Sequence, residues 1–148
     1  MKKLILFLIV LLSITVSAFA VNFASEKPVT DSEWNTLLNA MVEVESNGNV
    51  NAKTLDANGK YSYGCLQIQD LYLIDSRLDY TLNDLFNKEI SFEVAKAYLK
   101  RYAKSYETRT GKVATYEVIV RIHNGGPRGA EHSATNSYWT KVKAILEK

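Results

Sequence analysis

Two glutamates near the end of the first predicted helix differ in what surrounds them. Apolar residues recur at helical spacing before them, at Trp34, Leu37, Leu38, Met41 and Val42, and this pattern predicts one buried stripe. At about 100° per residue, Glu45 falls roughly 20° from Trp34, whereas Glu43 falls about 180° from it. We therefore expect Glu43 to face solvent and Glu45 to lie on the core side of the helix C-terminus.

A carboxyl group at the position of Glu45 is suited to proton transfer. Burial disfavours the charged form of a carboxyl group, and the negative end of the helix dipole acts in the same direction. A group that holds its proton near neutral pH can donate it to a leaving oxygen as a general acid. The same position also fits a glutamate that only caps or pairs locally at the helix end.

The elements that must position this glutamate are mostly helical. Thr30 and Glu33 form a capping-box pattern before the first helix, and Asn47 and Gly48 are typical of its end. The stretch 49–69 is rich in turn formers, and short strands or extended segments are predicted at Lys60–Tyr63 and Cys65–Ile68. Further helices are predicted to begin at the caps Thr81, Ser91, Thr115 and Thr135. The predicted fold class is α+β, mostly α, with a small β or irregular insert after the first helix.

Length, composition and the N-terminus restrict the class of protein. The 148 residues are one domain's worth, and the single cysteine excludes an intrachain disulfide. Two lysines, an apolar run and a final Ala18-Phe19-Ala20 predict a cleaved signal peptide at 1–20, with an uncleaved membrane anchor as the alternative. Cleavage would remove two of the 18 basic residues and none of the 16 acidic ones, which leaves no net charge to indicate nucleic-acid binding.

Four short motifs follow one another in a recognisable order. They are Glu45-Ser46, Gly64-Cys65-Leu66-Gln67, His123-Asn124-Gly125-Gly126 and Tyr138 on the last predicted helix. In this order they resemble the lysozyme-like domain of soluble lytic transglycosylases, which is related to goose-type and phage-type lysozymes. The resemblance covers residues 31–148, behind the signal peptide at 1–20 and an N-terminal lead-in at 21–30. Cys65, Leu66 and His123 depart from the usual Leu, Met and aromatic residue.

The resemblance implies a site without metal or organic cofactor. Glu45 is the implied catalytic acid, and Ser46 belongs to its motif. Gln67 resembles the amide that meets the acetamido group of the sugar, Asn124 with its glycines resembles the floor of the sugar groove, and Tyr138 resembles the tyrosine that hydrogen-bonds the catalytic glutamate. His123 is expected either to stack on sugar, to contact Glu45 or to have a structural role.

Aromatic residues beside the second motif can supply a platform for sugar rings, because they combine an apolar body with a polar tip. Tyr63, together with Tyr61, is the best placed of them.

A second carboxylate is less clearly indicated. Asp56 is the leading candidate because it follows Glu45 in the adjoining loop, ahead of Asp70 and Asp75, and a turn-forming aspartate is the alternative.

The resemblance implies an exported enzyme, periplasmic or extracellular, that cleaves the MurNAc–GlcNAc β-1,4 bond of peptidoglycan. The expected enzyme is a lytic transglycosylase, which uses one glutamate and leaves 1,6-anhydro-MurNAc ends. A lysozyme-type muramidase and a catalytically silent glycan-binding module are the alternatives. The expected partner is the glycan strand, bound by a monomer with no membrane anchor after cleavage.

Overall fold

Five α-helices, two strands and three short 3-10 segments follow one another in residues 27–148, the part of the chain that the computed structural model describes. Their order is α1 (Trp34–Ser46), β1 (Lys53–Leu55), β2 (Tyr61–Tyr63), α2 (Asp70–Ser76), η1 (Asp84–Phe86), α3 (Lys88–Thr110), α4 (Tyr116–Gly125), η2 (Gly129–Glu131), η3 (Ser133–Thr135) and α5 (Asn136–Leu146). The mostly helical α+β fold with its small insert after the first helix is confirmed. The predicted signal peptide at 1–20 lies outside the described residues, as does 21–26 of the lead-in.

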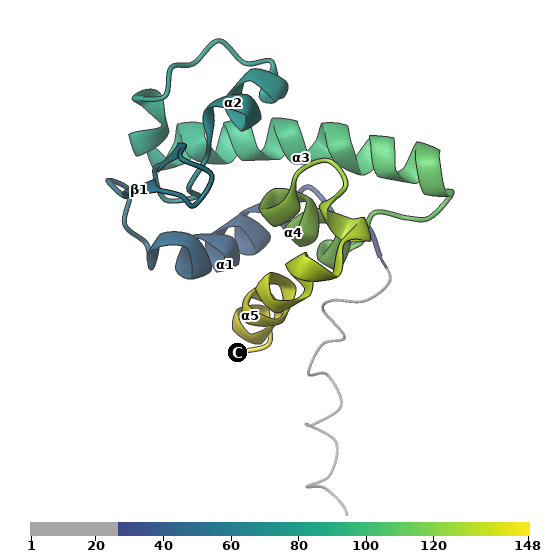
Figure 1. Ribbon diagram of the computed structural model, residues 1–148. Coiled ribbons are helices and arrows are strands. Elements are labelled where there is room, and N and C mark those ends of the chain that lie inside the picture. Colours follow the sequence, from purple (N-terminus) through teal and green to yellow (C-terminus); the bar gives the residue numbers. More distant parts are fainter. Residues whose placement is uncertain (1–26) are drawn as a thin grey trace, which may run out of the picture.

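The 23-residue helix α3 runs through the middle of the domain. In Figure 1, α2 lies above α3, and α1, α4 and α5 lie below it. The core fills the space between these helices, and its fully buried side chains include Leu37 and Met41 of α1, Leu99 of α3, Ile122 of α4 and Val142 of α5. One stripe from each helix thus contributes to a single core, as the helical spacing predicts.

The first helix begins and ends close to the predicted points. The Glu33 carboxylate accepts hydrogen bonds from the backbone N–H of Thr30 at 2.9 Å and from its hydroxyl at 2.6 Å, and the helix starts at the next residue. At the other end, Asn47 adopts a left-handed conformation with φ 51° and its N–H donates to the carbonyl of Glu43. The last turn therefore carries Glu45, whose side chain is 19% exposed, while Glu43 is exposed.

Of the residues predicted to cap helices, Thr115 does so, whereas Ser91 and Thr135 do not. Thr115 does cap α4, since its hydroxyl accepts from the N–H of Val118. Ser91 as a cap is wrong: α3 begins at Lys88 with Asn87 as its cap, and the buried Ser91 hydroxyl instead donates to the carbonyl of Leu85 at 2.6 Å. Thr135 precedes α5, but its hydroxyl donates to nearby carbonyls and caps no helical N–H. At Ser91 and at Thr135 the hydroxyl donates to a buried carbonyl instead, because a buried acceptor is costly to leave unpaired.

The two strands form an antiparallel hairpin whose register separates two faces. Thr54 pairs with Ser62, and on the other face Lys53 pairs with Tyr63 and Leu55 with Tyr61. Ser62 is buried at 3% exposure, whereas Leu55 and Tyr61 are exposed. Successive side chains of a strand point to opposite faces, so Ser62 lies on one face of the hairpin and the two tyrosines lie on the other, where Tyr63 is partly buried and Tyr61 is exposed.

The hairpin is followed by a tight turn that packs into the core. Gly64 has φ +71°, and a Cβ built there would lie 1.9 Å from the carbonyl oxygen of Leu85. Cys65, Leu66 and Ile68 of the same turn are fully buried. Glycine at position 64 therefore allows both the backbone conformation and the close approach of η1.

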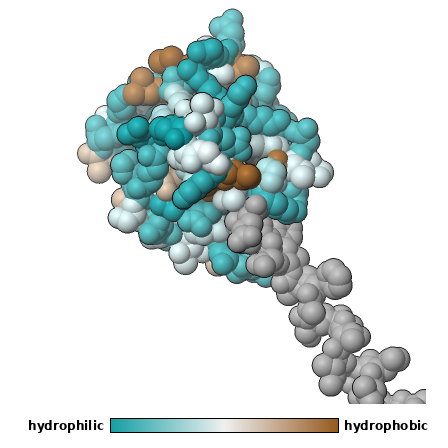
Figure 2. All heavy atoms as spheres, turned by 90° about the vertical axis from the view of Figure 1, so that its right-hand side faces the viewer, coloured by the Kyte–Doolittle hydropathy of each residue, from teal (hydrophilic) through white to brown (hydrophobic). Residues whose placement is uncertain are grey.

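The described helices show no membrane-spanning character. In residues 27–148 no helix is long and apolar enough to cross a bilayer. The face seen in Figure 2 is mostly hydrophilic, with a few separate hydrophobic residues. Residues 27–30 of the lead-in contact the domain, through an isolated bridge from Pro28 to Thr115 and an ion pair from Lys27 to Glu33 at 2.7 Å.

Substitution of Gly64 by alanine should destabilise the domain severely. The added methyl group would meet the Leu85 carbonyl, which is backbone and cannot move alone. We expect Gly64→Ala to lower the free energy of unfolding by roughly 3 kcal/mol or more. The matched control is Gly59→Ala, where φ is +78° but the space is open, so only about 1 kcal/mol of backbone strain is expected. Urea unfolding of both variants measures the difference, and equal losses would contradict the role given to the Leu85 carbonyl.

Glu33 should make the stability depend on acid pH. The hydrogen-bonded ammonium of Lys27 and then the Thr30 hydroxyl lower the pKa of Glu33 from 4.5 to about 2. Because the pKa is lower in the folded chain than in the unfolded one, this stabilisation is complete above pH 4.5 and disappears as the pH falls towards 2. Glu33→Gln should therefore be less stable than the original chain near neutral pH and equally stable below the folded pKa. Unfolding free energies measured over that range would refute this if their difference stayed constant.

Candidate active site

A cleft of about 800 Å³ lies between the hairpin, α2 and the end of α4. It is lined by residues singled out in the sequence, among them Glu45, Asp56, Gln67, His123 and Asn124. These residues come from segments up to 79 positions apart, between Glu45 and Asn124. The fold therefore gathers the first, second and third sequence motifs around one cavity.

Glu45 enters this cleft from the last turn of α1, beside His123 of α4. Nε2 of His123 lies 3.3 Å from Oε1 of Glu45, and the histidine side chain is only 4% exposed. Tyr138 of α5 is also buried close to this carboxylate, and burial, followed by the charge of Glu45, raises the pKa of the Tyr138 hydroxyl well above its usual value. Of the three roles expected for His123, contact with Glu45 is the one that the structure shows.

The far side of His123 is held by Tyr72 of α2. The Tyr72 hydroxyl lies 3.0 Å from Nδ1 of the imidazole, and the Tyr72 ring stacks on Tyr98 of α3 with centroids 3.5 Å apart. An ionised carboxylate can only accept hydrogen bonds, so Nε2 carries the proton when it faces an ionised Glu45. Nδ1 of the neutral ring then accepts from Tyr72. Burial raises the pKa of Tyr72 well above its usual value, which keeps this hydroxyl protonated.

Ser46 and Gln67 connect the helix end to the turn after the hairpin. The Ser46 hydroxyl donates to the carbonyl of Cys65 at 2.9 Å, so it joins two segments rather than simply capping its own helix. Gln67 has φ 49°, and its side-chain amide donates to the Gly64 carbonyl at 2.9 Å while it lines the cleft. The turn therefore presents an amide group to the cavity from a fixed backbone.

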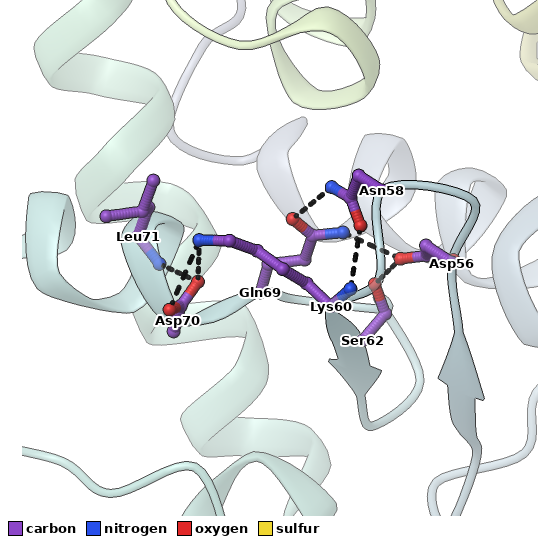
Figure 3. A network of polar contacts seen from close by, with 7 residues as sticks. All are labelled: Asp56, Asn58, Lys60, Ser62, Gln69, Asp70 and Leu71. Atoms are coloured by element: carbon purple, nitrogen blue, oxygen red, sulfur yellow. Dashed lines mark hydrogen bonds and ion pairs between the residues drawn. The ribbon is translucent and has the colours of Figure 1, made fainter.

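Among the three candidate second carboxylates, Asp56 is the one held on the hairpin side of the cleft. Its Oδ2 accepts from the hydroxyl of Ser62 and from Nε2 of Gln69, the latter at 2.7 Å (Figure 3). Asp70 is engaged elsewhere, with Lys60 at 3.1 Å and the N–H of Leu71 at 2.8 Å, and does not line the cleft. Asp75 lines the cleft from α2, and its carboxylate accepts from the Tyr102 hydroxyl.

Tyr63 is not brought to the cleft. Its ring lies on the outer face of the hairpin, near Tyr61 with centroids 6.5 Å apart and Phe86 with centroids 6.1 Å apart, and Lys53 lies over both tyrosine rings. The strand alternation that turns Ser62 inward necessarily turns its neighbours outward. The proposed sugar platform at Tyr61 and Tyr63 is therefore separate from the cavity that holds Glu45.

Sequence reasoning missed several residues that line the cleft, above all Tyr72, Ser62 and Gln69. No helix was predicted at α2, because its seven residues carry no long periodic pattern, and only Asp70 and Asp75 there were considered for the site. A helical assignment would have placed Tyr72 and the buried Ser76 on one face, four positions apart. Ser62 could have been found from the hairpin register, but only once the partner strand was known. Within residues 27–148, no cluster of three or more His, Cys, Asp or Glu side chains is arranged to hold a metal ion.

A mostly helical domain with a small hairpin, whose cleft is reached by a glutamate at the end of the first helix, has the lysozyme-like fold. The chain belongs to the transglycosylase SLT domain family, whose model matches residues 22–140. It is 39% identical to a lysozyme of Magallana gigas over 89 residues, which are 55% of this chain and 60% of that protein. It is 31% identical to a lysozyme of Meretrix lusoria over 59% of this chain and 70% of that protein. The crystal structure of Tapes japonica lysozyme superposes with a TM-score of 0.64 and 28% identity, covering 80% of this chain and 93% of the other.

Removal of the Tyr72 hydroxyl should change the NMR signal of the Nδ1 atom of His123. In Tyr72→Phe the hydroxyl that lies 3.0 Å from Nδ1 is lost, so we expect the Nδ1 signal to shift while Nε2 keeps its contact with Glu45. His132, the second of the two histidines and an exposed one, is the internal control and should not change. An unchanged Nδ1 signal would mean that the Tyr72 hydroxyl does not donate to His123.

Proposed function

We propose that this chain is an exported enzyme that hydrolyses the β-1,4 bond between N-acetylmuramic acid and N-acetylglucosamine in peptidoglycan, as a lysozyme does. The observation that carries the proposal is that Glu45 and Asp56, from different elements, line one cleft in different surroundings. Glu45 lies against His123, while Asp56 accepts hydrogen bonds from two neutral donors. Glycosidases usually use a pair of carboxyl groups whose environments differ. The lysozymes among its relatives support the same reaction.

The proposed reaction assigns one role to each carboxyl group. Glu45, in its protonated form, donates a proton to the glycosidic oxygen as the bond from that oxygen to C1 breaks. The positive charge that develops on the sugar ring is stabilised by the ionised Asp56, directly or through a covalent bond to C1. Glu45, now ionised, removes a proton from a water molecule whose oxygen attacks C1. The products are two shorter glycans, one with a reducing muramoyl end, and both carboxyl groups return to their starting states.

Two side-chain amides that line the cleft suit the N-acetyl groups of this substrate, those of Gln67 and Asn124. The NH₂ group of Gln67 donates to the Gly64 carbonyl, so its oxygen would accept from an acetamido N–H, whereas the amide of Asn124 would offer a donor and an acceptor. Ser46 would act through the turn that carries Gln67, because its hydroxyl holds the Cys65 carbonyl. Tyr138 would help to hold Glu45 in place. The assignments of these four residues as supporting groups are part of the proposal.

Lytic transglycosylation is a second candidate, favoured by the family model itself. In that reaction Glu45 would first protonate the leaving oxygen and then accept the proton of the muramoyl 6-hydroxyl, whose oxygen closes a ring on C1. No second carboxylate is required, so Asp56 would be dispensable. The products differ from those of hydrolysis, since each cut leaves a 1,6-anhydro end in place of a reducing end.

Product analysis of purified peptidoglycan separates these reactions. The mature chain should release fragments with reducing muramoyl ends, and both Glu45→Gln and Asp56→Asn should lower the rate by roughly a hundredfold or more. Glu43→Gln is the matched control, because Glu43 lies two positions away on the same helix and faces solvent. Mass spectrometry of the fragments is the measurement. Anhydro ends, with Asp56→Asn fully active, would replace hydrolysis by transglycosylation. Glycan binding without any fragments would indicate a catalytically silent module.

A further inference from the structure

A chain of three hydrogen bonds ends on the carboxylate of Asp56. The backbone N–H of Lys60 donates to Oδ1 of Asn58 at 3.0 Å, and Nδ2 of Asn58 donates to Oε1 of Gln69 at 3.2 Å. Nε2 of Gln69 then donates to Oδ2 of Asp56 at 2.7 Å. Figure 3 shows that this chain runs from the tip of the hairpin across to the residue before α2 and back to the hairpin.

The direction of this chain is fixed by its first member. A backbone N–H can only donate, so the oxygen of Asn58 must face Lys60 and its NH₂ group must face Gln69. The oxygen of Gln69 is thereby turned towards Asn58, and its NH₂ group towards Asp56. A reversal of either amide would bring two donors or two acceptors together. The network therefore delivers an N–H group to Asp56 in one orientation only.

Both donors reach the same oxygen of Asp56. Ser62 and Gln69 each donate to Oδ2, and among the hydrogen bonds of residues 27–148 none ends on Oδ1. Carboxylate geometry then fixes the direction in which Oδ1 points. The two hydrogen bonds to Oδ2 hold the carboxylate in place, and Oδ1 remains available for an interaction in the cleft.

The partners that hold Asp56 are neutral donors rather than cations. The titratable groups that face the cleft are Glu45 from α1, Tyr72 and Asp75 from α2, Tyr98 from α3 and His123 from α4. Within the described residues, no lysine or arginine lines this cleft. Lys60 is close in sequence, but its ammonium is paired with Asp70 at 3.1 Å. The orientation of the Asp56 carboxylate is therefore set by hydrogen bonds and not by an ion pair.

We infer that Gln69 and Asn58 are positioning residues that orient the Asp56 carboxylate for the reaction, an inference that rests on the hydrolytic function proposed above. Gln69 acts directly on Asp56, and Asn58 acts through Gln69. The same network also connects the hairpin with α2, but the Lys60–Asp70 ion pair already makes that connection between the same two elements. The separate contribution of the amide chain is therefore its action on one carboxylate.

Gln69→Met tests the direct step, because methionine has a similar length and no donor. We expect kcat to fall roughly tenfold or more while KM changes less than about threefold, because the carboxylate loses its fixed orientation. Asn58→Ala should produce smaller changes of the same sign. Thermal unfolding, measured first, reports whether each variant folds. The Gln69 side chain accepts no capping hydrogen bond from the N–H groups of α2, so methionine removes none.

Lys60→Met is the matched control. It removes the ion pair between the hairpin and α2 but leaves every donor to Asp56 in place, so kcat should not change. The inference is overturned if Gln69→Met and Asn58→Ala keep the original kcat while Asp56→Asn is inactive, and the proposed function then stands. It is also overturned if Lys60→Met lowers kcat as much as Gln69→Met. Full activity of Asp56→Asn would instead contradict the hydrolytic role of Asp56. Failure of the proposed function is therefore recognised from a different variant than failure of this inference.

Discussion

The hydrogen bond from the Ser46 hydroxyl to the Cys65 carbonyl joins the two halves of the cleft. It attaches the end of α1, where Glu45 lies, to the turn that follows the hairpin. That turn can reach the helix end only because Gly64 approaches the Leu85 carbonyl so closely. The position of Asp56 on the hairpin, and of Gln67 on the turn, both follow from this attachment. The local geometry of one turn therefore determines how the acid group and its partners face one another.

The two carboxyl groups of the site are given different surroundings by different parts of the fold. Glu45 lies among aromatic rings and the buried His123 imidazole, a setting supplied by α2, α4 and α5. Asp56 receives a hydroxyl and an amide donor from the hairpin and from the residue before α2. The two carboxyl groups therefore meet the same cleft with different neighbours, aromatic and imidazole rings in one case and neutral hydrogen-bond donors in the other.

The cleft is supported mainly by buried aromatic packing. Tyr72 stacks on Tyr98 and reaches His123 with its hydroxyl, so one residue connects three helices. The one cysteine, Cys65, is buried in the turn and serves as an apolar side chain. The rigidity of the site therefore comes from close packing and from hydrogen bonds with a single possible direction. Such contacts hold the side chains of the site without an intrachain disulfide, which the single cysteine excludes.

The sequence alone determined the helix that carries Glu45, its buried side and its end at Asn47, because helical periodicity and turn chemistry are local properties. The order of the motifs also indicated the fold, and it led to Glu45 as the proposed catalytic residue. Only the tertiary structure decided that Ser91 pairs with a buried carbonyl rather than capping α3, that Tyr63 lies outside the cleft, and that Tyr72 and Gln69 lie within it. Each of these depends on which distant segment lies opposite. Local spacing contains no information about that choice, since strand register and burial are fixed only when the whole core packs.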